Sequence, residues 1–336
     1  MARSSTEFRA IILAGGSGER FWPLSTPEHP KQFLRIFGGT SLIRQSVQRL
    51  EGLVRPERIF VVTSRQLVAA TRRELPELPR ENVVGEPLRR DTGAAVALGV
   101  AVASGVVAEA QPSSRMVLGF FPADQLVLKP DAFRASLRKA IAAAERSETI
   151  VTLGIKPGYA ATGFGYVDPK TGRFHEKPSA ARACVYLRKG YLWNAGMFIA
   201  RADVFRAAFA SLAPSLAPLL GLRRIAGLTK LYQELPRISF DRAILEKLPQ
   251  VAVVRTDCGW DDVGSYAAFD RYFPHDSRGN IREGPCTVVE SDGNVCVARS
   301  ARISLLGVRN LVVVTTPDSV LVVDKSRIAD MKKLFG

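Results

Sequence analysis

Apolar segments of strand length alternate with helical patterns through the first half of the chain. The predicted strands are Arg9–Ala14, Arg58–Thr63, Met116–Phe121 and Ile150–Ile155, and the predicted helices are Ser41–Leu50, Gln66–Leu75, Thr92–Ala110 and Asp131–Arg146. This alternation favours parallel strands, because each connection between parallel neighbours needs a crossover that a helix can supply. The sequence therefore predicts an α/β fold in which helices cover both faces of a mainly parallel sheet.

The ends of two predicted strands mark where chemistry is expected. In open α/β sheets, ligands bind beyond the carboxyl ends of the strands. The segments that directly follow Ala14 and Phe121 are therefore the first places to look for functional side chains.

The second half of the chain changes character twice. Between Tyr159 and Phe198, glycine-rich turns separate short strands, which predicts a separate lobe, and a helical stretch follows at Arg201–Leu222. Beyond Phe273, a small β domain is expected, with turns at short intervals. Its predicted elements are strands at Cys286–Glu290, Val295–Arg299, Leu311–Thr315 and Val320–Val323 and a short helix at Arg327–Leu334. We therefore expect two domains, residues 1–272 and 273–336.

Composition places the chain among ordinary soluble proteins. Hydrophobic residues make up 46% of its 336 residues and charged residues 24%, which is typical of globular domains. The N-terminus lacks the apolar stretch of a signal peptide, and the uncharged run between Asp91 and Glu109 is short and rich in Ala and Gly. That run favours a buried helix over a membrane helix. We therefore expect a cytoplasmic protein with no membrane partner, in which the four scattered cysteines are reduced thiols.

The net charge of +15 could attract nucleic acid or phosphorylated small molecules. Lys and Arg are spread along the chain with no run of five, and the chain has neither zinc-ligand spacing nor the aromatic strands of RNA-binding domains. These absences disfavour a nucleic-acid partner. A generally basic surface that also attracts nucleotide substrates is the better interpretation.

A glycine-rich turn follows the first predicted strand. Gly15, Gly16 and Gly18 allow the backbone to turn tightly and to point several N–H groups at one anion. Arg20 and Lys31 add positive charge suited to a triphosphate. This is a candidate phosphate-binding loop.

Two common phosphate motifs can be excluded by counting. A dinucleotide-binding fingerprint that starts at Gly16 needs a third glycine where the chain has Phe21. A P-loop that starts at Gly15 needs Gly-Lys where the chain has Arg20 and Phe21. The glycines therefore belong to a different type of phosphate loop.

Candidate metal ligands follow the strand that ends at Phe121 and also occur much later. Asp124 stands directly beyond that strand, and Asp261 and Asp262 lie in the glycine-bounded turn GWDDVGSY. Mg²⁺ is usually held by one or two carboxylates together with substrate oxygens. An Asp after a strand is also a common turn former or helix cap, so the residue types alone leave both interpretations open.

Three later stretches offer groups suited to a sugar phosphate. TGFGYV supplies backbone groups at Gly165; FHEKPS supplies Glu176, an acceptor for hydroxyls, and Lys177, a cation for a phosphate. YLWNAGMFI supplies Asn194, and Gly196 leaves room beside it. Taken singly, these stretches also fit a surface hairpin, a solvated charge pair and a structural turn.

The complete strings are more specific than their parts. LAGGSGERFWPLS followed by PKQF resembles the signature of the nucleoside-diphosphate-sugar pyrophosphorylases, and WPLS…PKQF is similar to its mannose-1-phosphate guanylyltransferase branch. The ordered motifs G-F-G-Y, E-K-P and W-N-x-G-M-F resemble the sugar-phosphate half of the same family. The resemblance implies a Rossmann-like fold of the nucleotide-diphospho-sugar transferase type with a small C-terminal β domain. It also implies an enzyme that forms GDP-mannose and pyrophosphate from GTP and mannose 1-phosphate with Mg²⁺.

The resemblance also implies roles for individual residues. Nucleotide binding would fall to Leu13, Ala14, Gly15, Gly16, Gly18, Arg20, Glu86 and Thr92, and catalysis to Arg20, Lys31, Asp124 and Asp262. Asp124 and Asp262 would hold the metal, with Asp261 as a neighbour of the ligand. The sugar phosphate would contact Gly165, Glu176, Lys177, Asn194 and Gly196. Relatives tend to pair through elements outside the catalytic core, so a homodimer is expected.

One segment departs from the family pattern. In Gly85–Gly99, relatives more often carry Asn-Thr-Ala-Pro where this chain has Asp91, Thr92, Gly93 and Ala94. Glu86 and the backbone around it would still suit a purine edge. The alternatives are another sugar-1-phosphate nucleotidyltransferase, which would use UTP or dTTP with glucose 1-phosphate, and a non-catalytic nucleotide-sugar sensor. A sensor would usually lack the loop Arg, the loop Lys or a metal acid, and this chain keeps all of them.

Overall fold

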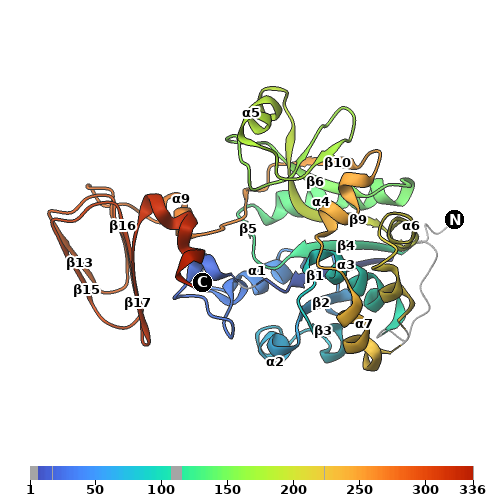
Figure 1. Ribbon diagram of the computed structural model, residues 1–336, viewed down its shortest axis with the longest axis horizontal. Coiled ribbons are helices and arrows are strands. Elements are labelled where there is room, and N and C mark those ends of the chain that lie inside the picture. The colour runs from blue at the N-terminus through green and yellow to red at the C-terminus, as the bar shows by residue number, and fades with distance from the viewer. Residues whose placement is uncertain (1–6, 17, 107–115, 223, 336) are drawn as a thin grey trace. The chain divides into compact units, whose positions relative to one another are not determined.

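The computed structural model describes residues 7–16, 18–106, 116–222 and 224–335 (Figure 1). Contacts within the chain divide it into two compact units. Unit 1 contains the described residues up to Gly15 together with Arg44–Ala123 and Val127–Trp260. Unit 2 contains Gly16–Ile43, Asp124–Leu126 and the described residues from Asp261 onward. The predicted boundary between residues 272 and 273 remains a proposal.

Unit 1 is built on a mainly parallel sheet, as predicted. Its central path runs β10-β6-β9-β4-β1-β2-β3, and only β9 is antiparallel to its neighbours β4 and β6. These strands are β1 (Phe8–Ala14), β2 (Ile59–Ser64), β3 (Val83–Glu86), β4 (Val117–Pro122), β6 (Val151–Ile155), β9 (Leu192–Arg201) and β10 (Ala252–Thr256). Leu13 pairs with Pro122, so β1 and β4 end side by side.

Helices cover both faces of this sheet, which confirms the predicted fold class. Phe120 packs edge-on against Phe205 of α6 at 5.0 Å between ring centroids, whereas Phe121 packs against Phe133 of α4 at 6.0 Å. Adjacent residues of a strand point to opposite faces, so α6 and α4 cover opposite faces. The helices of the described chain are α1 (Leu42–Gln48), α2 (Val68–Glu74), α3 (Asp91–Ala101), α4 (Pro130–Arg146), α5 (Ala180–Arg188), α6 (Ala202–Leu212), α7 (Leu228–Glu234), α8 (Phe240–Ala243) and α9 (Phe269–Tyr272).

Helix α3 is the buried helix predicted from the apolar run. Every residue from Gly93 to Ala101 is buried, which explains why the run lacks charged side chains. The helix was predicted to reach Ala110, but it ends at Ala101 and a wider helical turn continues to Val106. Residues 107–110 lie outside the described chain. No described helix is both long and apolar enough to cross a membrane.

The lobe predicted between Tyr159 and Phe198 contains two short strands, β7 (Tyr166–Val167) and β8 (Phe174–His175). The prediction of short strands fails for β9, which has 10 residues and joins the lobe to the central sheet. Helix α5 was not predicted; it begins where the Ser179 side chain accepts a hydrogen bond from the Arg182 N–H. Serine at this position satisfies a donor that the first helical turn leaves free.

The C-terminal part of unit 2 forms coiled layers of parallel strands (orange to red in Figure 1). One sheet contains β12 (Ile281–Glu283), β14 (Val295–Ala298), β16 (Leu311–Thr316) and β17 (Ser319–Asp324), and a second contains β13 (Cys286–Val289) and β15 (Ile303–Leu306). Only β17 pairs antiparallel. The four predicted strands are confirmed, whereas β12 and β15 were missed. A 3₁₀ segment, Lys325–Leu334, stands where the terminal helix was expected.

Side chains of β14 alternate between two hydrophobic clusters. Val295 and Val297 join the cluster that contains Phe269 of α9, whereas Cys296 packs with Ile303 and other residues inside the coil. This alternation follows from the two-residue repeat of a strand. It joins the coil to α9 through a continuous core within unit 2. All four cysteines are free thiols, as expected.

Candidate active site

The glycine-rich turn begins where β1 ends, so Leu13 and Ala14 are the last residues of a buried strand and Gly15 and Gly16 follow it. Gly18 has φ +65°, and a Cβ placed on it would lie 2.4 Å from the Lys31 Cβ. Both the left-handed backbone and this close approach require glycine. The turn therefore brings the loop backbone against the predicted loop lysine.

Aromatic packing fixes the segment that carries Arg20. Phe21 is fully buried, and its ring lies edge-on to Tyr266 at 5.3 Å between centroids. The Tyr266 hydroxyl donates to the Phe21 carbonyl at 2.9 Å. Arg20 is itself exposed, so its guanidinium is presented to solvent from an anchored turn.

Lys31 joins the two predicted metal residues. Its side chain is almost completely buried, and its Nζ donates to Asp124 Oδ2 at 2.9 Å and to the Asp262 carbonyl at 2.7 Å. Three residues that are far apart in sequence therefore meet at one ammonium group. A buried ammonium is tolerated because it is paired and hydrogen-bonded.

Asp262 lies in a partly buried environment that contains charges of both signs. Burial raises the pKa of Asp262, the positive charges of Lys31 and Arg20 oppose this shift, and the negative charge of Asp124 adds to it. Lys31 and Arg20 together only offset the charges of Asp124 and Asp262, and the phosphates of a nucleotide would add further negative charge. A divalent cation would balance it.

Asp124 and Asp262 suit a Mg²⁺ ion that is coordinated partly by protein carboxylates and partly by substrate phosphates. Among the described residues, no group of three or more His, Cys, Asp or Glu side chains is placed to hold a metal. Mg²⁺ does not need such a cage, since one or two carboxylates suffice when substrate phosphates supply other oxygens. These two aspartates are the residues that could hold it.

A second group of predicted residues lies in unit 1, around the end of β3. The Glu86 side chain is buried, and one of its carboxylate oxygens is 3.1 Å from where a Cβ on Gly15 would lie. The Tyr232 hydroxyl donates to the other oxygen at 3.0 Å. Burial raises the pKa of Glu86 to about 7; the Tyr232 hydrogen bond opposes the shift and the charge of Asp91 adds to it. The structure thus places Glu86 beside the start of the glycine turn.

The segment that departs from the family pattern joins α3 to α8. Thr92 Oγ1 accepts a hydrogen bond from the Phe240 N–H at 2.9 Å. The next residue is Gly93, and a Cβ there would lie 2.6 Å from the Ile238 carbonyl oxygen. Glycine is therefore required by close packing at this position. The role of Thr92 in nucleotide binding remains a prediction.

The predicted sugar-phosphate residues gather in the lobe of unit 1. Asn194 is buried, and its Oδ1 accepts from Thr152 Oγ1 at 2.7 Å and from the Gly196 N–H at 3.1 Å. Its backbone N–H donates to the Gly165 carbonyl at 2.8 Å. One Glu176 oxygen would lie 3.0 Å from a Cβ on Gly165. The three motifs therefore converge.

Lys177 completes this group but is held differently. Its Nζ lies 3.2 Å from Glu176 Oε1, yet its side chain is more than half exposed, whereas that of Glu176 is only 6% exposed. The backbone of Lys177 has φ +39°, which is uncommon for a residue with a side chain. The ammonium is therefore open to solvent, whereas the carboxylate with which it pairs is enclosed.

Asp241 is a member of this group that sequence reasoning missed. The Asn194 Nδ2 donates to Asp241 Oδ1 at 3.0 Å. Burial raises the pKa of Asp241 to about 7; the charge of Glu176 adds to this shift and the charge of Lys177 opposes it. The signal in the sequence is Ser239 followed by Phe240 and Asp241, which is the usual start of an exposed helix. Nothing local indicates that this aspartate lies partly buried beside Asn194.

Tyr232, which donates a hydrogen bond to Glu86, was also not predicted as a site residue, because its local sequence suggests only core packing. It lies on α7 and is fully buried. A tyrosine in an amphipathic helix is most simply interpreted as core packing. Its hydroxyl gains a polar partner only because the fold brings α7 to the end of β3.

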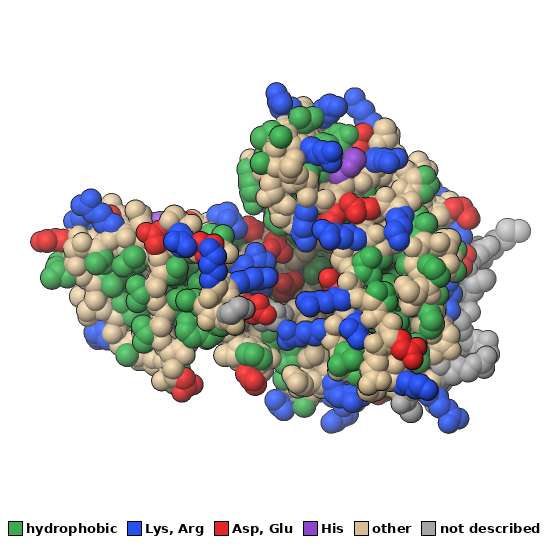
Figure 2. Space-filling model, in the orientation of Figure 1, with side chains coloured by type: hydrophobic (Ala, Val, Ile, Leu, Met, Phe, Trp, Pro, Cys, Tyr) green, Lys and Arg blue, Asp and Glu red, His purple; other side chains and the backbone are tan. Residues whose placement is uncertain are grey.

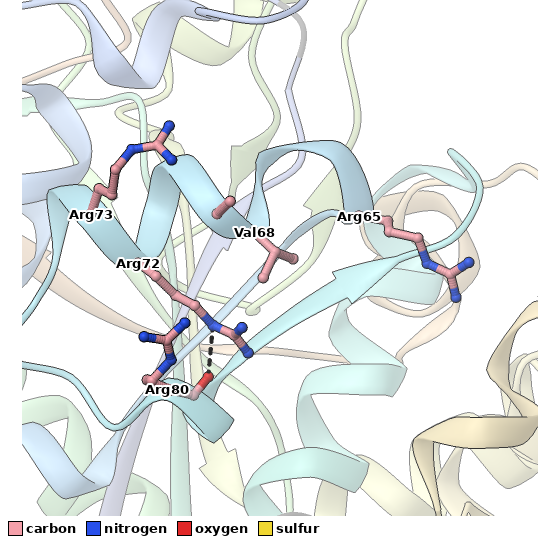
Figure 3. A pocket seen from close by; sticks show the side chains of 6 residues that line it. Arg65, Val68, Arg72, Arg73 and Arg80 are labelled. Carbon is pink, nitrogen blue, oxygen red and sulfur yellow. Dashed lines mark hydrogen bonds between the residues drawn. The ribbon is translucent and has the colours of Figure 1, made fainter.

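An arginine-lined pocket elsewhere in unit 1 is a poorer candidate for the active site. It has a volume of about 360 Å³ and is lined by Arg65, Val68, Ala69, Arg72, Arg73 and Arg80. Figure 3 shows Arg72 near Arg80, while Arg65 and Arg73 extend in different directions. Arg72 Nε also donates to the Arg80 carbonyl at 3.0 Å. The guanidinium groups do not converge on one point, and the pocket contains none of the predicted residues.

Two known protein families match the sequence, and both matches agree with the fold described above. Residues 9–220 match the family described as "Nucleotidyl transferase", and residues 284–336 match the "MannoseP isomerase/GMP-like beta-helix domain". The first match covers the glycine turn and all of the predicted site residues except Asp262. The second match agrees with the coiled parallel strands at the C-terminus. The protein is a nucleotidyltransferase.

Similar proteins of known name show to which family of nucleotidyltransferases the chain belongs. The chain is 33% identical to a mannose-1-phosphate guanylyltransferase from Escherichia coli and 34% identical to the xanthan biosynthesis protein XanB from Xanthomonas campestris, and the matches cover 96–97% of this chain and 72% of each relative. A solved structure described as "mannose-1-phosphate geranyltransferase" from Thermus thermophilus is 36% identical, with a TM-score of 0.86 over 98% of both chains. The chain belongs to the mannose-1-phosphate guanylyltransferase family.

Proposed function

We propose that this chain makes GDP-mannose from GTP and mannose 1-phosphate. An oxygen of the sugar phosphate attacks the α-phosphorus of GTP, the bond from that phosphorus to the oxygen bridging the β-phosphate breaks, and pyrophosphate leaves. The names of the relatives support the two substrates. The observation that carries the reaction is Lys31, whose Nζ is bonded to both Asp124 and Asp262.

The phosphate loop and the two aspartates would control charge during this step. Phosphoryl-group transfer asks for positioning and electrostatic stabilisation more than for covalent chemistry. Arg20 and Lys31 would stabilise the triphosphate and the charge that develops as pyrophosphate leaves. Asp124 and Asp262 would hold Mg²⁺, which when bound polarises phosphoryl oxygens and screens their charge.

The groups of unit 1 would select and orient the substrates. A deprotonated Glu86 can accept the two adjacent N–H donors of a guanine edge, which uracil and thymine lack. Asn194 and Glu176 would bind sugar hydroxyls, and Lys177 would bind the sugar phosphate. Because buried polar groups reject a ligand that leaves them unpaired, these residues would discriminate between substrates.

The surface supports small anionic substrates better than a nucleic-acid partner. On the face shown in Figure 2, lysine and arginine side chains occur in separate groups among acidic and apolar ones. A duplex would require a continuous basic stripe. We also propose that the enzyme works in the cytoplasm and forms a homodimer. Analytical ultracentrifugation at several protein concentrations tests the oligomeric state.

The test is pyrophosphate release from a panel of substrates. GTP, UTP, dTTP and ATP are each combined with mannose, glucose and N-acetylglucosamine 1-phosphates, with and without Mg²⁺. We expect the highest kcat/KM for GTP with mannose 1-phosphate and no turnover without a divalent cation. A preference for UTP or dTTP would refute the guanylyl assignment, and binding of nucleotide sugar without any product would favour a sensor.

The Asp124→Asn variant tests the role of the metal acid in the same assay. We expect at least about a 100-fold loss of turnover, because one of the two carboxylates that would hold the metal is removed. The fold should persist, since the Asp124 side chain is 38% exposed. Asp257→Asn is the matched control, because Asp257 is exposed and pairs only with Lys129 among the described residues. Normal turnover by Asp124→Asn would refute the assignment.

A further inference from the structure

Asp261 stands directly beside the predicted metal ligand Asp262, but its carboxylate is already fully engaged. Arg271 donates to it twice, from Nε to Oδ2 at 2.8 Å and from Nη2 to Oδ1 at 3.0 Å. The Tyr272 hydroxyl donates to Oδ2 at 2.7 Å, and the Val263 N–H donates to Oδ1 at 2.7 Å. Each carboxylate oxygen therefore accepts two hydrogen bonds.

The turn that carries Asp262 is strained, which explains why it needs support. Val263, the next residue, has φ +38°. A left-handed backbone is unfavourable for a β-branched residue and persists only where its surroundings impose it. Val263 is completely buried, and its N–H is the group that Asp261 accepts. Side-chain packing and the Asp261 carboxylate thus hold the strained residue on both sides.

The two side chains that donate to Asp261 come from a helix that is anchored in the hydrophobic core. Arg271 and Tyr272 both belong to α9, whose Phe269 stacks on Phe273 with ring centroids 4.3 Å apart. Phe269 is fully buried in the core of unit 2. The two donors to Asp261 therefore project from a helix that cannot easily shift.

We propose that Asp261 is a positioning residue and that Asp261, Arg271 and Tyr272 form a brace that holds the Asp262 turn in its metal-binding conformation. This proposal deepens the metal assignment made above and rests on it. A bidentate guanidinium pair has defined geometry, so it orients the turn as well as neutralising Asp261. Both oxygens of Asp261 are occupied by these donors, which leaves Asp124 and Asp262 to bind the cation.

The alternative is that Asp261 is itself a metal ligand. In that case, its oxygens would have to leave Arg271 and Tyr272 before they could coordinate the ion. The two hypotheses predict opposite effects when Arg271 is removed. Loss of Arg271 loosens the turn if Asp261 is a brace, but frees a carboxylate for the metal if Asp261 is a ligand.

The experiment measures Mn²⁺ binding to the full chain by electron paramagnetic resonance, together with the Mg²⁺ concentration that gives half-maximal pyrophosphate release. We expect Arg271→Ala to weaken Mn²⁺ binding and to raise the Mg²⁺ half-saturation about tenfold, the size typical of a lost outer-shell contact. The kcat at saturating Mg²⁺ should remain within about twofold, because the brace touches no reacting atom. Arg271→Lys should restore part of the affinity.

The matched control is Arg278→Ala. Arg278 makes a bidentate pair with Asp292 at 2.8 and 3.1 Å, and its side chain is as exposed as that of Arg271. Its loss should leave both metal readouts unchanged. A cooperative unfolding transition, measured in EDTA so that no metal is bound, shows that a variant is folded. If Arg271→Ala does not fold, Arg271→Lys takes its place in both metal measurements.

Tighter or unchanged Mn²⁺ binding by Arg271→Ala would overturn the proposal. So would an Asp261→Asn variant that loses Mn²⁺ as completely as Asp262→Asn does. Failure of the proposed function is distinguishable: it would appear as a wild-type chain that forms no nucleotide sugar with any triphosphate. The Mn²⁺ series would still decide the role of Asp261 in that case.

Discussion

At the scale of single residues, this protein places ionisable groups where water cannot fully solvate them. Lys31 is 5% exposed, Glu86 is 8% exposed and Asn194 donates to the partly buried carboxylate of Asp241. Such groups are costly for the folded state unless each has a partner. Buried polar clusters of this kind, with shifted pKa values, are typical of sites that bind and transform ligands.

The Glu86→Gln variant should reveal the cost of burying this carboxyl group. Its pKa is about 7 in the folded chain against 4.5 when unperturbed. Between these values the unfolded chain loses the proton and the folded chain keeps it, so the wild-type contribution to stability falls as pH rises from 4.5 to 7. Glutamine cannot ionise, and we expect the variant to gain up to about 3 kcal/mol over wild type at pH 8.

Urea unfolding at pH 4.5 and at pH 8 measures this difference. The gain should be small at the lower pH, where the folded chain keeps the Glu86 proton and the unfolded chain is only half ionised. Asp241 also has a raised pKa, but it is present in both proteins and cancels in the comparison. An equal gain at the two pH values would show that Glu86 does not titrate in this range.

At the scale of elements, the glycine turn after β1 is shaped by what it packs against. Gly18 would place a Cβ 2.4 Å from Lys31, and Ser25 Oγ donates to the Gly18 carbonyl at 2.6 Å. The turn and the lysine are therefore one structural feature. A change in the backbone of one must move the other.

Gly18→Ala should displace Lys31 and thereby weaken binding of the triphosphate. We expect a loss of about 2–3 kcal/mol in the free energy of unfolding, from positive φ and steric overlap together, and a raised KM for GTP. Gly39→Ala is the matched control, because Gly39 has φ +79° with no heavy atom within 4 Å of the added Cβ. It should cost only about 1 kcal/mol. Equal effects at both positions would exclude a contribution from Lys31.

At the scale of the whole molecule, the net charge of +15 creates a field that favours anionic substrates. Since salt screens such fields over about 10 Å at 0.1 M, we expect the KM for GTP to rise severalfold between 50 and 300 mM KCl, with little change in kcat. Initial rates at fixed free Mg²⁺ measure both constants. A KM that is independent of salt would show that only local contacts bind the triphosphate.

The sequence predicts most of the central sheet and the glycine-rich turn that follows β1. Periodicity identified β1, β2, β4 and β6 to within one or two residues at each end, because buried parallel strands leave continuous apolar runs. It missed β3, which has four residues, and β10, whose side chains are mostly only partly buried. It could not show that the C-terminal strands pair parallel, because pairing direction depends on partners distant in the chain.

The sequence by itself therefore determined the α/β class and the family motifs, including the glycine-rich turn after β1, since each depends on a short stretch of chain. Only the tertiary structure decided which polar groups are buried and which partners they have. It placed Asp241 beside Asn194, Tyr232 on Glu86 and Arg271 on Asp261. Burial and long-range hydrogen bonds decide whether an aspartate is a turn former, a positioning group or a ligand, and they arise when distant segments pack together.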